Sequence, residues 1–143
     1  MKTAVITGAS SGIGRATLAE LTKKGYRVIG IGRDKARCEQ TKQEILAGTS
    51  DANITFLCAD LMQQRDVERV AAEIREILAR ENEDRLDVLI NNAGCVRSWY
   101  TTTEEGYEQQ FALNHLASFL LTYRLLVPLR KAQGRVIMTG SES

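Results

Sequence analysis

The first residues that could do chemistry form a glycine-rich turn near the start of the chain. A short apolar run leads into Thr7-Gly8-Ala9-Ser10-Ser11-Gly12-Ile13-Gly14, and a segment of helical period follows. Glycines lack a Cβ and let the backbone approach a ligand closely. Unpaired N–H groups and a partial positive charge at the helix start favour an anion such as a pyrophosphate. The turn predicts a dinucleotide site, with candidate cofactor-binding residues at Gly8, Ser10, Ser11, Gly12, Ile13 and Gly14.

Polar residues also follow later apolar runs. Asp60, Asn92 and Ser141 stand just after such runs, and Asn91 ends one of them. In a parallel sheet the carboxyl ends of the strands meet at one edge, where ligands bind. We therefore expect these residues to share a crevice with the glycine-rich turn. For Asp60 the alternative is a plain helix N-cap, because aspartate is favoured there.

Asn114 lies in the middle of a predicted helix. Asparagine is unfavourable there because its amide competes for backbone hydrogen bonds, so a polar task is the better interpretation. Ser141 could be a mere loop hydroxyl, and Ser143 is its rival for a chemical role. His115 is expected to be structural or to face solvent.

The composition argues against several classes of partner. The chain has 143 residues, 43% of them apolar, which is enough for one compact domain spanning residues 1–143. Its formal net charge of +1 supplies no long-range field to gather nucleic acid or an anionic membrane. Three scattered cysteines and one histidine show no spacing typical of zinc ligands, so we expect no metal site.

Two apolar stretches bear on localisation. The run at 4–6 stops at Thr7, whereas a signal peptide needs an apolar region of roughly 7–15 residues. The stretch at 111–127 carries Asn114, His115 and Arg124, which makes it too polar to span a membrane. We expect a cytoplasmic protein.

Short β-branched runs alternate with segments of helical period along the chain. The apolar runs are typical of strands buried on both faces, so we predict an α/β fold with a doubly wound parallel sheet of the Rossmann type. The predicted strands are 3–7, 27–31, 53–59, 87–91 and 135–139, and the predicted helices are 12–24, 35–47, 63–80 and 104–131.

The fourth helix is predicted to run from Glu104 to Lys131. Overlapping Ser/Thr-x-x-Glu capping boxes at 101–105 favour its start. Its apolar residues occupy two faces, and one sheet can bury only one of them. We expect a second subunit to cover the other face, so that the protein is a homo-oligomer. The alternative is a central helix wedged between its neighbours.

In these motifs the chain resembles the short-chain dehydrogenases/reductases of the classical type along its whole length. Asp60-Leu61 is similar to the family's adenine-ring contact. Asn91-Asn92-Ala93-Gly94 is similar to its sheet-stabilising and cofactor-lining motif. The resemblance places Asn114 at the catalytic asparagine and Ser141 at the catalytic serine. It implies hydride transfer between a nicotinamide cofactor and a small-molecule carbonyl or alcohol.

The end of the second strand favours NADP over NAD. NAD enzymes commonly place an acidic residue there for the ribose 2′-hydroxyl, and in the family's frame that position is Gly32. Arg33 follows and could pair with a 2′-phosphate. If Asp34 faced the ribose instead, the preference would invert.

The resemblance also implies a Tyr-x-x-x-Lys motif, which this sequence does not contain. Four residues after Tyr26, Tyr100, Tyr107 and Tyr123 stand Gly30, Glu104, Phe111 and Val127. We therefore expect an amino-terminal portion of an enzyme, truncated after the fifth strand of a larger sheet and inactive by itself. The alternative is a non-catalytic NADP(H)-binding module or sensor.

Overall fold

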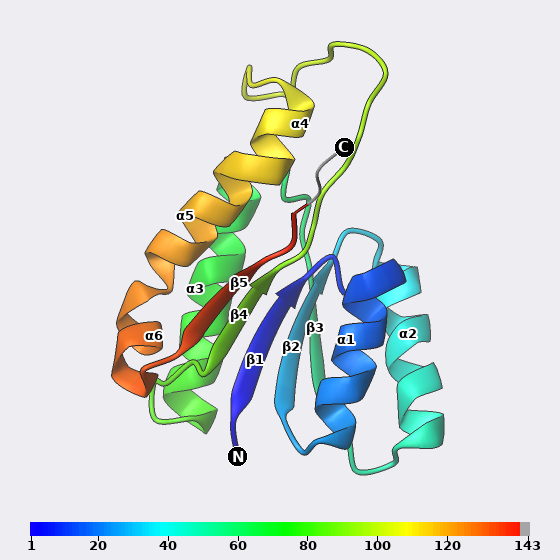
Figure 1. Cartoon of the computed structure of the whole chain (residues 1–143), viewed down its shortest axis with the longest axis vertical. Helices are drawn as coiled ribbons and strands as arrows, with labels where there is room; N and C mark the ends of the chain where they lie inside the picture. Colours follow the sequence, from blue (N-terminus) through cyan, green and yellow to red (C-terminus); the bar gives the residue numbers. More distant parts are fainter. Residues whose placement is uncertain (141–143) are drawn as a thin grey trace.

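Five parallel strands form one sheet with helices on both faces (Figure 1). The structure is a computed structural model and describes residues 1–140. The strand order is β3-β2-β1-β4-β5, so the direction of winding reverses beside β1. The strands are β1 (Thr3–Thr7), β2 (Arg27–Gly32), β3 (Asn53–Cys58), β4 (Val88–Asn91) and β5 (Arg135–Met138). This is the predicted doubly wound, Rossmann-type sheet.

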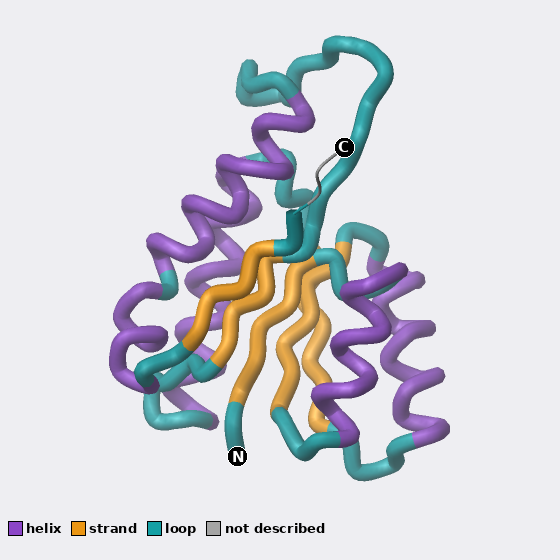
Figure 2. Tube along the Cα trace, viewed as in Figure 1, coloured by secondary structure: helices purple, strands orange, loops and turns teal. Residues whose placement is uncertain are grey.

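The helices divide between the two faces of the sheet. Helices α1 and α2 cover one face, and α3 packs with the later helices on the other, as Figure 2 also shows. Their bounds are α1 (Gly12–Lys23), α2 (Lys35–Gly48), α3 (Gln64–Glu81), α4 (Gln109–Phe111), the π-helical turn η1 (Ala112–Leu116), α5 (Ala117–Arg124) and α6 (Leu126–Ala132).

Neighbouring residues of one strand belong to different cores. In β1, Val5 packs with the α3 side whereas Ile6 packs with the α1 and α2 side, and both are fully buried. Leu89 and Ile90 divide in the same way along β4. Burial on both faces explains why these strands are continuous apolar runs rather than alternating ones.

The predicted fourth helix is wrong in its start and in its continuity. Gly106 has a φ of 90°, which no helix interior allows, and the threonines at 101–103 belong to a tight turn. The helical segment begins at Gln109 behind the carboxylate of Glu108, which caps it. It breaks again at Leu125 because Pro128 has no N–H and its ring collides with the carbonyl four residues earlier.

The segment from α4 to α6 buries one face and exposes the other. Ala117 and Leu121 are buried on the α3 side, whereas Phe119 and Tyr123 are exposed. A helix wedged between neighbours on both sides is therefore not what residues 1–140 form. Strand β5 lies at the sheet edge, with all four residues exposed.

Within residues 1–140 no single helix is long and apolar enough to cross a membrane. The pair Gln109–Arg124 and Leu126–Ala132 reaches that length and hydropathy only when taken together, across a bend of 62°.

Candidate functional site: a nucleotide cleft at the strand ends

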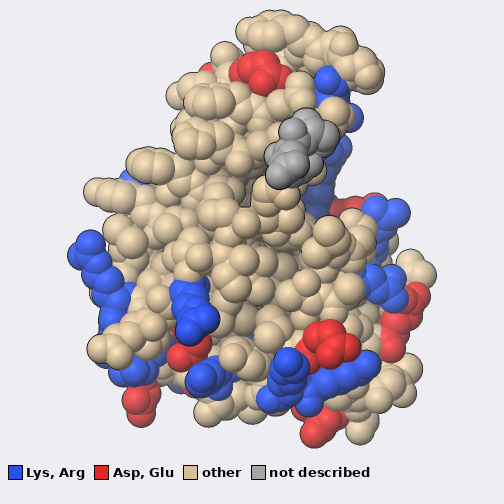
Figure 3. All heavy atoms as spheres, viewed as in Figure 1, with Lys and Arg blue, Asp and Glu red and all other residues tan. Residues whose placement is uncertain are grey.

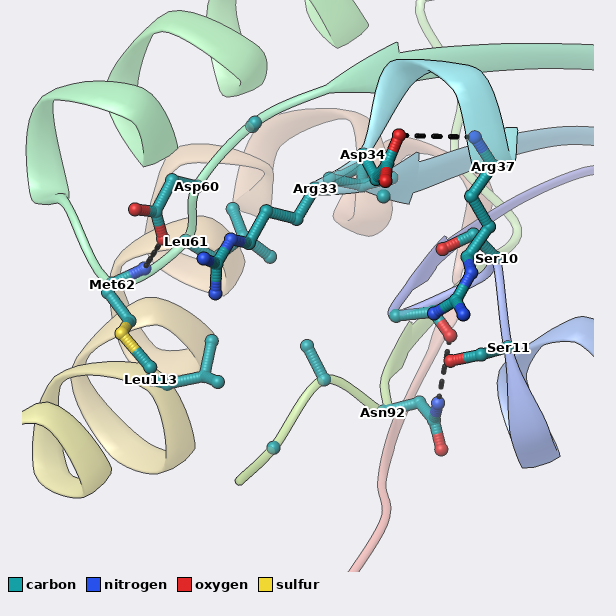
Figure 4. Close-up of a pocket in the computed structure, with 16 residues that line it drawn as sticks. Ser10, Ser11, Arg33, Asp34, Arg37, Asp60, Leu61, Met62, Asn92 and Leu113 are labelled. Carbon is teal, nitrogen blue, oxygen red and sulfur yellow. Dashed lines mark hydrogen bonds between the residues drawn. The ribbon is translucent and has the colours of Figure 1, made fainter. Parts of the chain in front are cut away.

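An open cleft of about 480 Å³ lies at the carboxyl ends of the central strands. It is built from the turns that follow β1, β2, β3 and β4, together with one residue of η1 (Figure 4). This is where ligands bind in a doubly wound sheet whose strand order reverses. Its lining comprises Gly8, Ser10, Ser11, Ile31, Gly32, Arg33, Asp34, Arg37, Ala59, Asp60, Leu61, Met62, Asn92, Ala93, Gly94 and Leu113.

The cleft gathers most of the residues predicted from the sequence. Gly12, Ile13, Gly14, Asn91 and Asn114 are absent from its lining within the described residues. Ser141 lies outside the described residues. The sequence predictions missed Ile31, Arg37, Ala59, Met62 and Leu113 as lining residues.

Two glycines of the first turn allow three backbone segments to meet. Gly8 has a φ of 64°, and a Cβ there would stand 3.0 Å from the Cα of Ala93. At Gly14 a Cβ would collide with the Gly8 carbonyl and lie 2.6 Å from Asn92 Nδ2. These positions therefore serve the close approach of α1 to the turn, which places the helix start beside the cleft.

Thr7 joins the glycine-rich turn to the segment after β4. Its buried hydroxyl oxygen accepts hydrogen bonds from the backbone N–H groups of Asn92 and Ala93, both at 2.9 Å. In return Asn92 Nδ2 donates to the Gly8 carbonyl at 3.4 Å. This role of Thr7 is not evident from the sequence, because its partners lie 85 and 86 residues away.

The two remaining polar predictions hold neighbouring elements together. Asn91 is 2% exposed, and its Nδ2 donates to Thr122 Oγ1 at 3.1 Å and lies 3.3 Å from Met138 Sδ. Asn114 lies in η1, where its amide makes a reciprocal pair of hydrogen bonds with the backbone of Cys95 at 2.8 and 2.9 Å. Asn91 thus ties β4 to α5 and β5, and Asn114 fixes the chain that leaves the cleft.

The wall after β3 is a hydrogen-bonded turn. Asp60 Oδ1 accepts from Met62 N–H at 3.1 Å, and Asp66 accepts from Asp60 N–H at 2.8 Å. The N-cap position of α3 is Gln63, so the alternative interpretation of Asp60 as a plain helix N-cap is wrong. The turn presents Leu61 and Met62 to the cleft (Figure 4).

The wall after β2 carries two guanidinium groups. Arg33 and Arg37 both line the cleft, and in Figure 4 the Arg37 side chain extends toward Ser10 and Ser11. Asp34 Oδ1 accepts from the N–H groups of Ala36 and Arg37 at 2.9 and 3.2 Å, which makes Asp34 the N-cap of α2. Arg37 follows Asp34 by three residues, so a helix cap at Asp34 puts Arg37 in the first turn of α2, beside the cleft. The cap is therefore the sequence signal that could have identified Arg37.

A side chain at the position before Arg33 would displace the neighbouring side chains of Cys38 and Ser10. A Cβ at Gly32 would overlap the sulfur of Cys38 and stand 3.1 Å from Ser10 Oγ. Burial, and secondly the neighbouring Cys58, raise the pKa of the Cys38 thiol above its usual value. Cys38 therefore stays protonated and adds no negative charge beside the two arginines.

The comparisons with known proteins agree with this geometry. Residues 2–143 match the family model described as short chain dehydrogenase. The chain belongs to the short-chain dehydrogenase family. It is 44% identical to retinol dehydrogenase 14 of Mus musculus over 152 residues, covering 99% of this chain and 44% of that protein. It is 40% identical to retinol dehydrogenase 13 of Homo sapiens over 141 residues, covering 98% of this chain and 41% of that protein.

A solved structure shares the fold. The short-chain dehydrogenase from Sphingobium yanoikuyae in complex with NADPH aligns with a TM-score of 0.82 and 29% identity, covering 99% of this chain and 54% of that one. The chain spans less than half the length of the two retinol dehydrogenases that it matches. The match therefore covers the half of the family fold that carries the nucleotide cleft.

Replacing Thr7 with Val should destabilise the cleft. Valine keeps the shape but removes the acceptor for two backbone N–H groups, so the free energy of unfolding should fall by about 1–3 kcal/mol in urea titrations. The matched control, Thr7→Ser, keeps the oxygen and should remain within about 1 kcal/mol of the wild type. Equal losses for the two variants would show that the methyl group matters and not the hydroxyl.

The start of α4 should loosen in acid. Hydrogen bonds from the backbone of Gln110 and Phe111 lower the pKa of Glu108. A lowered folded-state pKa means that this cap contributes stability above the ordinary glutamate pKa and loses it as pH falls through the lowered value. Hydrogen exchange of the Gln110 and Phe111 amides should accelerate across that range relative to neighbouring amides, and Glu108→Gln should abolish the extra dependence. If Glu108→Gln showed the same pH dependence of exchange as the wild type, this role of Glu108 would be contradicted.

Proposed function

We propose that this protein is the cofactor-binding part of an NADP(H)-dependent oxidoreductase that interconverts a carbonyl and an alcohol. The observation that carries the proposal is the end of β2. Gly32 carries no acidic side chain, and Arg33 and Arg37 line the cleft directly beyond it. A ribose 2′-phosphate needs cations at this position, whereas a 2′-hydroxyl needs a carboxylate.

The carboxylate of Asp34 does not reverse this preference. Its Oδ1 is engaged by two backbone N–H groups at the start of α2. The alternative in which Asp34 faces the ribose would take that cap away from the helix. We therefore assign the 2′-phosphate subsite to Arg33 and Arg37, with NADP(H) as the cofactor and NAD(H) as the poorer ligand.

The other walls fit the remaining parts of a dinucleotide. The start of α1, with no side-chain cap from Ser11 among the described residues, leaves first-turn N–H groups for the pyrophosphate of the cofactor. Asp60 and Leu61 would contact the adenine, and Asn92, Ala93 and Gly94 would line the nicotinamide side. When bound, the cofactor supplies a hydride.

The names of the retinol dehydrogenase relatives support an alcohol or carbonyl substrate. In the proposed reaction Ser141 holds the substrate oxygen. Asn114 positions a water for proton transfer through its main chain, because its side-chain amide is already bonded to the backbone of Cys95. A Tyr-x-x-x-Lys pair is not part of these 143 residues. Acid/base groups that act as a unit fail together, so this chain by itself should bind nucleotide with negligible turnover.

Removing one of the two arginines should weaken the binding of NADPH much more than the binding of NADH. Arg33→Ala should weaken NADPH binding by roughly ten- to a hundredfold, because a charge-assisted contact to phosphate is worth about 1.5–3 kcal/mol. Binding of NADH, which lacks the 2′-phosphate, should change little. Both dissociation constants can be measured by calorimetric titration. Equal losses for NADPH and NADH would overturn the assignment.

We also propose that the exposed face of α4 to α5 contacts a second copy of this chain. Phe111, His115, Phe119 and Tyr123 form a stacked row along it, with ring centroids 5.2–6.4 Å apart. Figure 3 shows charged side chains gathered away from this face, which is largely uncharged above α5 and β5. Such a continuous apolar face is typical of subunit interfaces.

A charge placed in this row should prevent association. Phe119 is 63% exposed, so Phe119→Glu leaves the monomer core intact. In sedimentation velocity the wild type should form dimers or larger species and the variant should remain monomeric, whereas Val96→Glu, at a position 90% exposed on another segment, should behave like the wild type. A monomeric wild type would refute the homo-oligomer.

A further inference from the structure

The turn at residues 101–108 connects two elements that are distant in sequence. Thr103 N–H donates to the Tyr107 carbonyl at 2.6 Å, and Gln109 N–H donates to the Thr101 carbonyl at 2.8 Å, which closes the turn on itself. Its last residue, Glu108, caps α4. The opposite side of the turn carries Glu104 and Glu105 toward α3. The turn thus stands between the start of α4 and the start of α3.

Glu105 caps α3 from outside that helix. Its two carboxylate oxygens accept hydrogen bonds from the backbone N–H groups of Gln64 and Arg65, the latter at 3.3 Å, across 41 and 40 positions of sequence. Gln63 stands at the N-cap position, yet its side chain makes no capping hydrogen bond among the described residues. A carboxylate at this end also interacts favourably with the helix dipole.

The first turn of α3 is hydrogen-bonded to one wall of the nucleotide cleft. Asp66, within that turn, accepts from Asp60 N–H at 2.8 Å, and Gln63 N–H donates to the Asp60 carbonyl at 3.0 Å. Asp60 then holds Met62 N–H at 3.1 Å. Asp60, Leu61 and Met62 all line the cleft. These hydrogen bonds to the start of α3 therefore fix the position of the wall after β3.

We propose that Glu105 is a positioning residue for nucleotide binding: from the turn at 101–108 it fixes the first turn of α3 and thereby the Asp60–Met62 wall of the cleft. The inference rests on the proposed function, because it concerns the adenine side of the same site. It also links that wall to the segment that carries Glu108 and Asn114. A change in the turn is therefore transmitted to the nucleotide, and nucleotide binding stabilises the turn.

Glu104 is a matched control within the same turn. It is the adjacent residue, carries the same charge and also faces α3, where it pairs with the guanidinium of Arg65. That pair is exposed on both sides, and exposed ion pairs contribute little. Loss of Glu104 therefore changes the charge of the turn without removing the helix cap.

The experiment compares Glu105→Ala, Glu105→Gln and Glu104→Ala with the wild type, using NADPH and adenosine 2′,5′-bisphosphate as probes in calorimetric titrations. Glu105→Ala should raise both dissociation constants by about fivefold or more, within the range of coupling between linked sites. Glu105→Gln keeps one acceptor oxygen and should give a smaller loss. Glu104→Ala should stay within about twofold. Because the second probe lacks the nicotinamide half, an equal loss for both probes places the effect on the adenine side.

Hydrogen exchange of the Gln64 and Arg65 amides in the ligand-free protein gives a second measurement that needs no nucleotide. It should accelerate in Glu105→Ala and remain unchanged in Glu104→Ala. Equal effects of the two alanine variants on binding, or unchanged binding by both Glu105 variants, would overturn the inference. A wild type that binds neither probe would overturn the proposed function, and the inference about binding with it. The exchange data would then show separately whether the cap itself exists.

Discussion

The cleft depends on the meeting of two turns at the point where the strand order reverses. Strand β1 pairs with β2 on one side and β4 on the other, so the chain segments that leave β1 and β4 lie next to each other. The Thr7 hydroxyl binds the backbone of Asn92 and Ala93, and Gly14 lets α1 pack against that joint. Without these contacts the start of α1 would have no fixed position opposite the Asn92–Gly94 wall. One buried hydroxyl thus sets the distance between the two sides of the site.

The helical segment after β4 repeats this principle farther from the sheet. Its π-helical turn carries Asn114, whose side-chain amide forms two hydrogen bonds with the backbone of Cys95. A π-turn inserts an extra residue into the helix, which re-aims side chains and is frequent at functional sites. The segment is anchored at its start by Glu108 and bent near its end by Pro128. Its position is therefore set by polar contacts at one end and by backbone constraints at the other.

The sequence predicts the sheet well because its signals are local. Runs such as Val88 to Ile90 must be buried on both faces, and the glycine pattern after β1 has a steric cause that any reader of the sequence can name. The position of Glu105 was not predictable in this way, since the threonines before it form a plausible capping box and its real partner is α3. Thr7 was missed for a related reason, because its partners lie 85 and 86 residues away and only the folded chain brings them together. Arg37 does have a local signal, since it lies in the first turn of the helix that Asp34 caps.

The proposed binding of NADP(H) in the cleft at the strand ends can be followed residue by residue. The most direct test is a map of backbone amide chemical shifts during titration with NADPH. The largest changes should fall on Gly8, Arg33, Asp60 and Asn92, which belong to four different turns of the cleft. The amides of the exposed aromatic row around Phe119 should not move. Changes confined to that row, or no changes at saturating nucleotide, would contradict NADP(H) binding in this cleft.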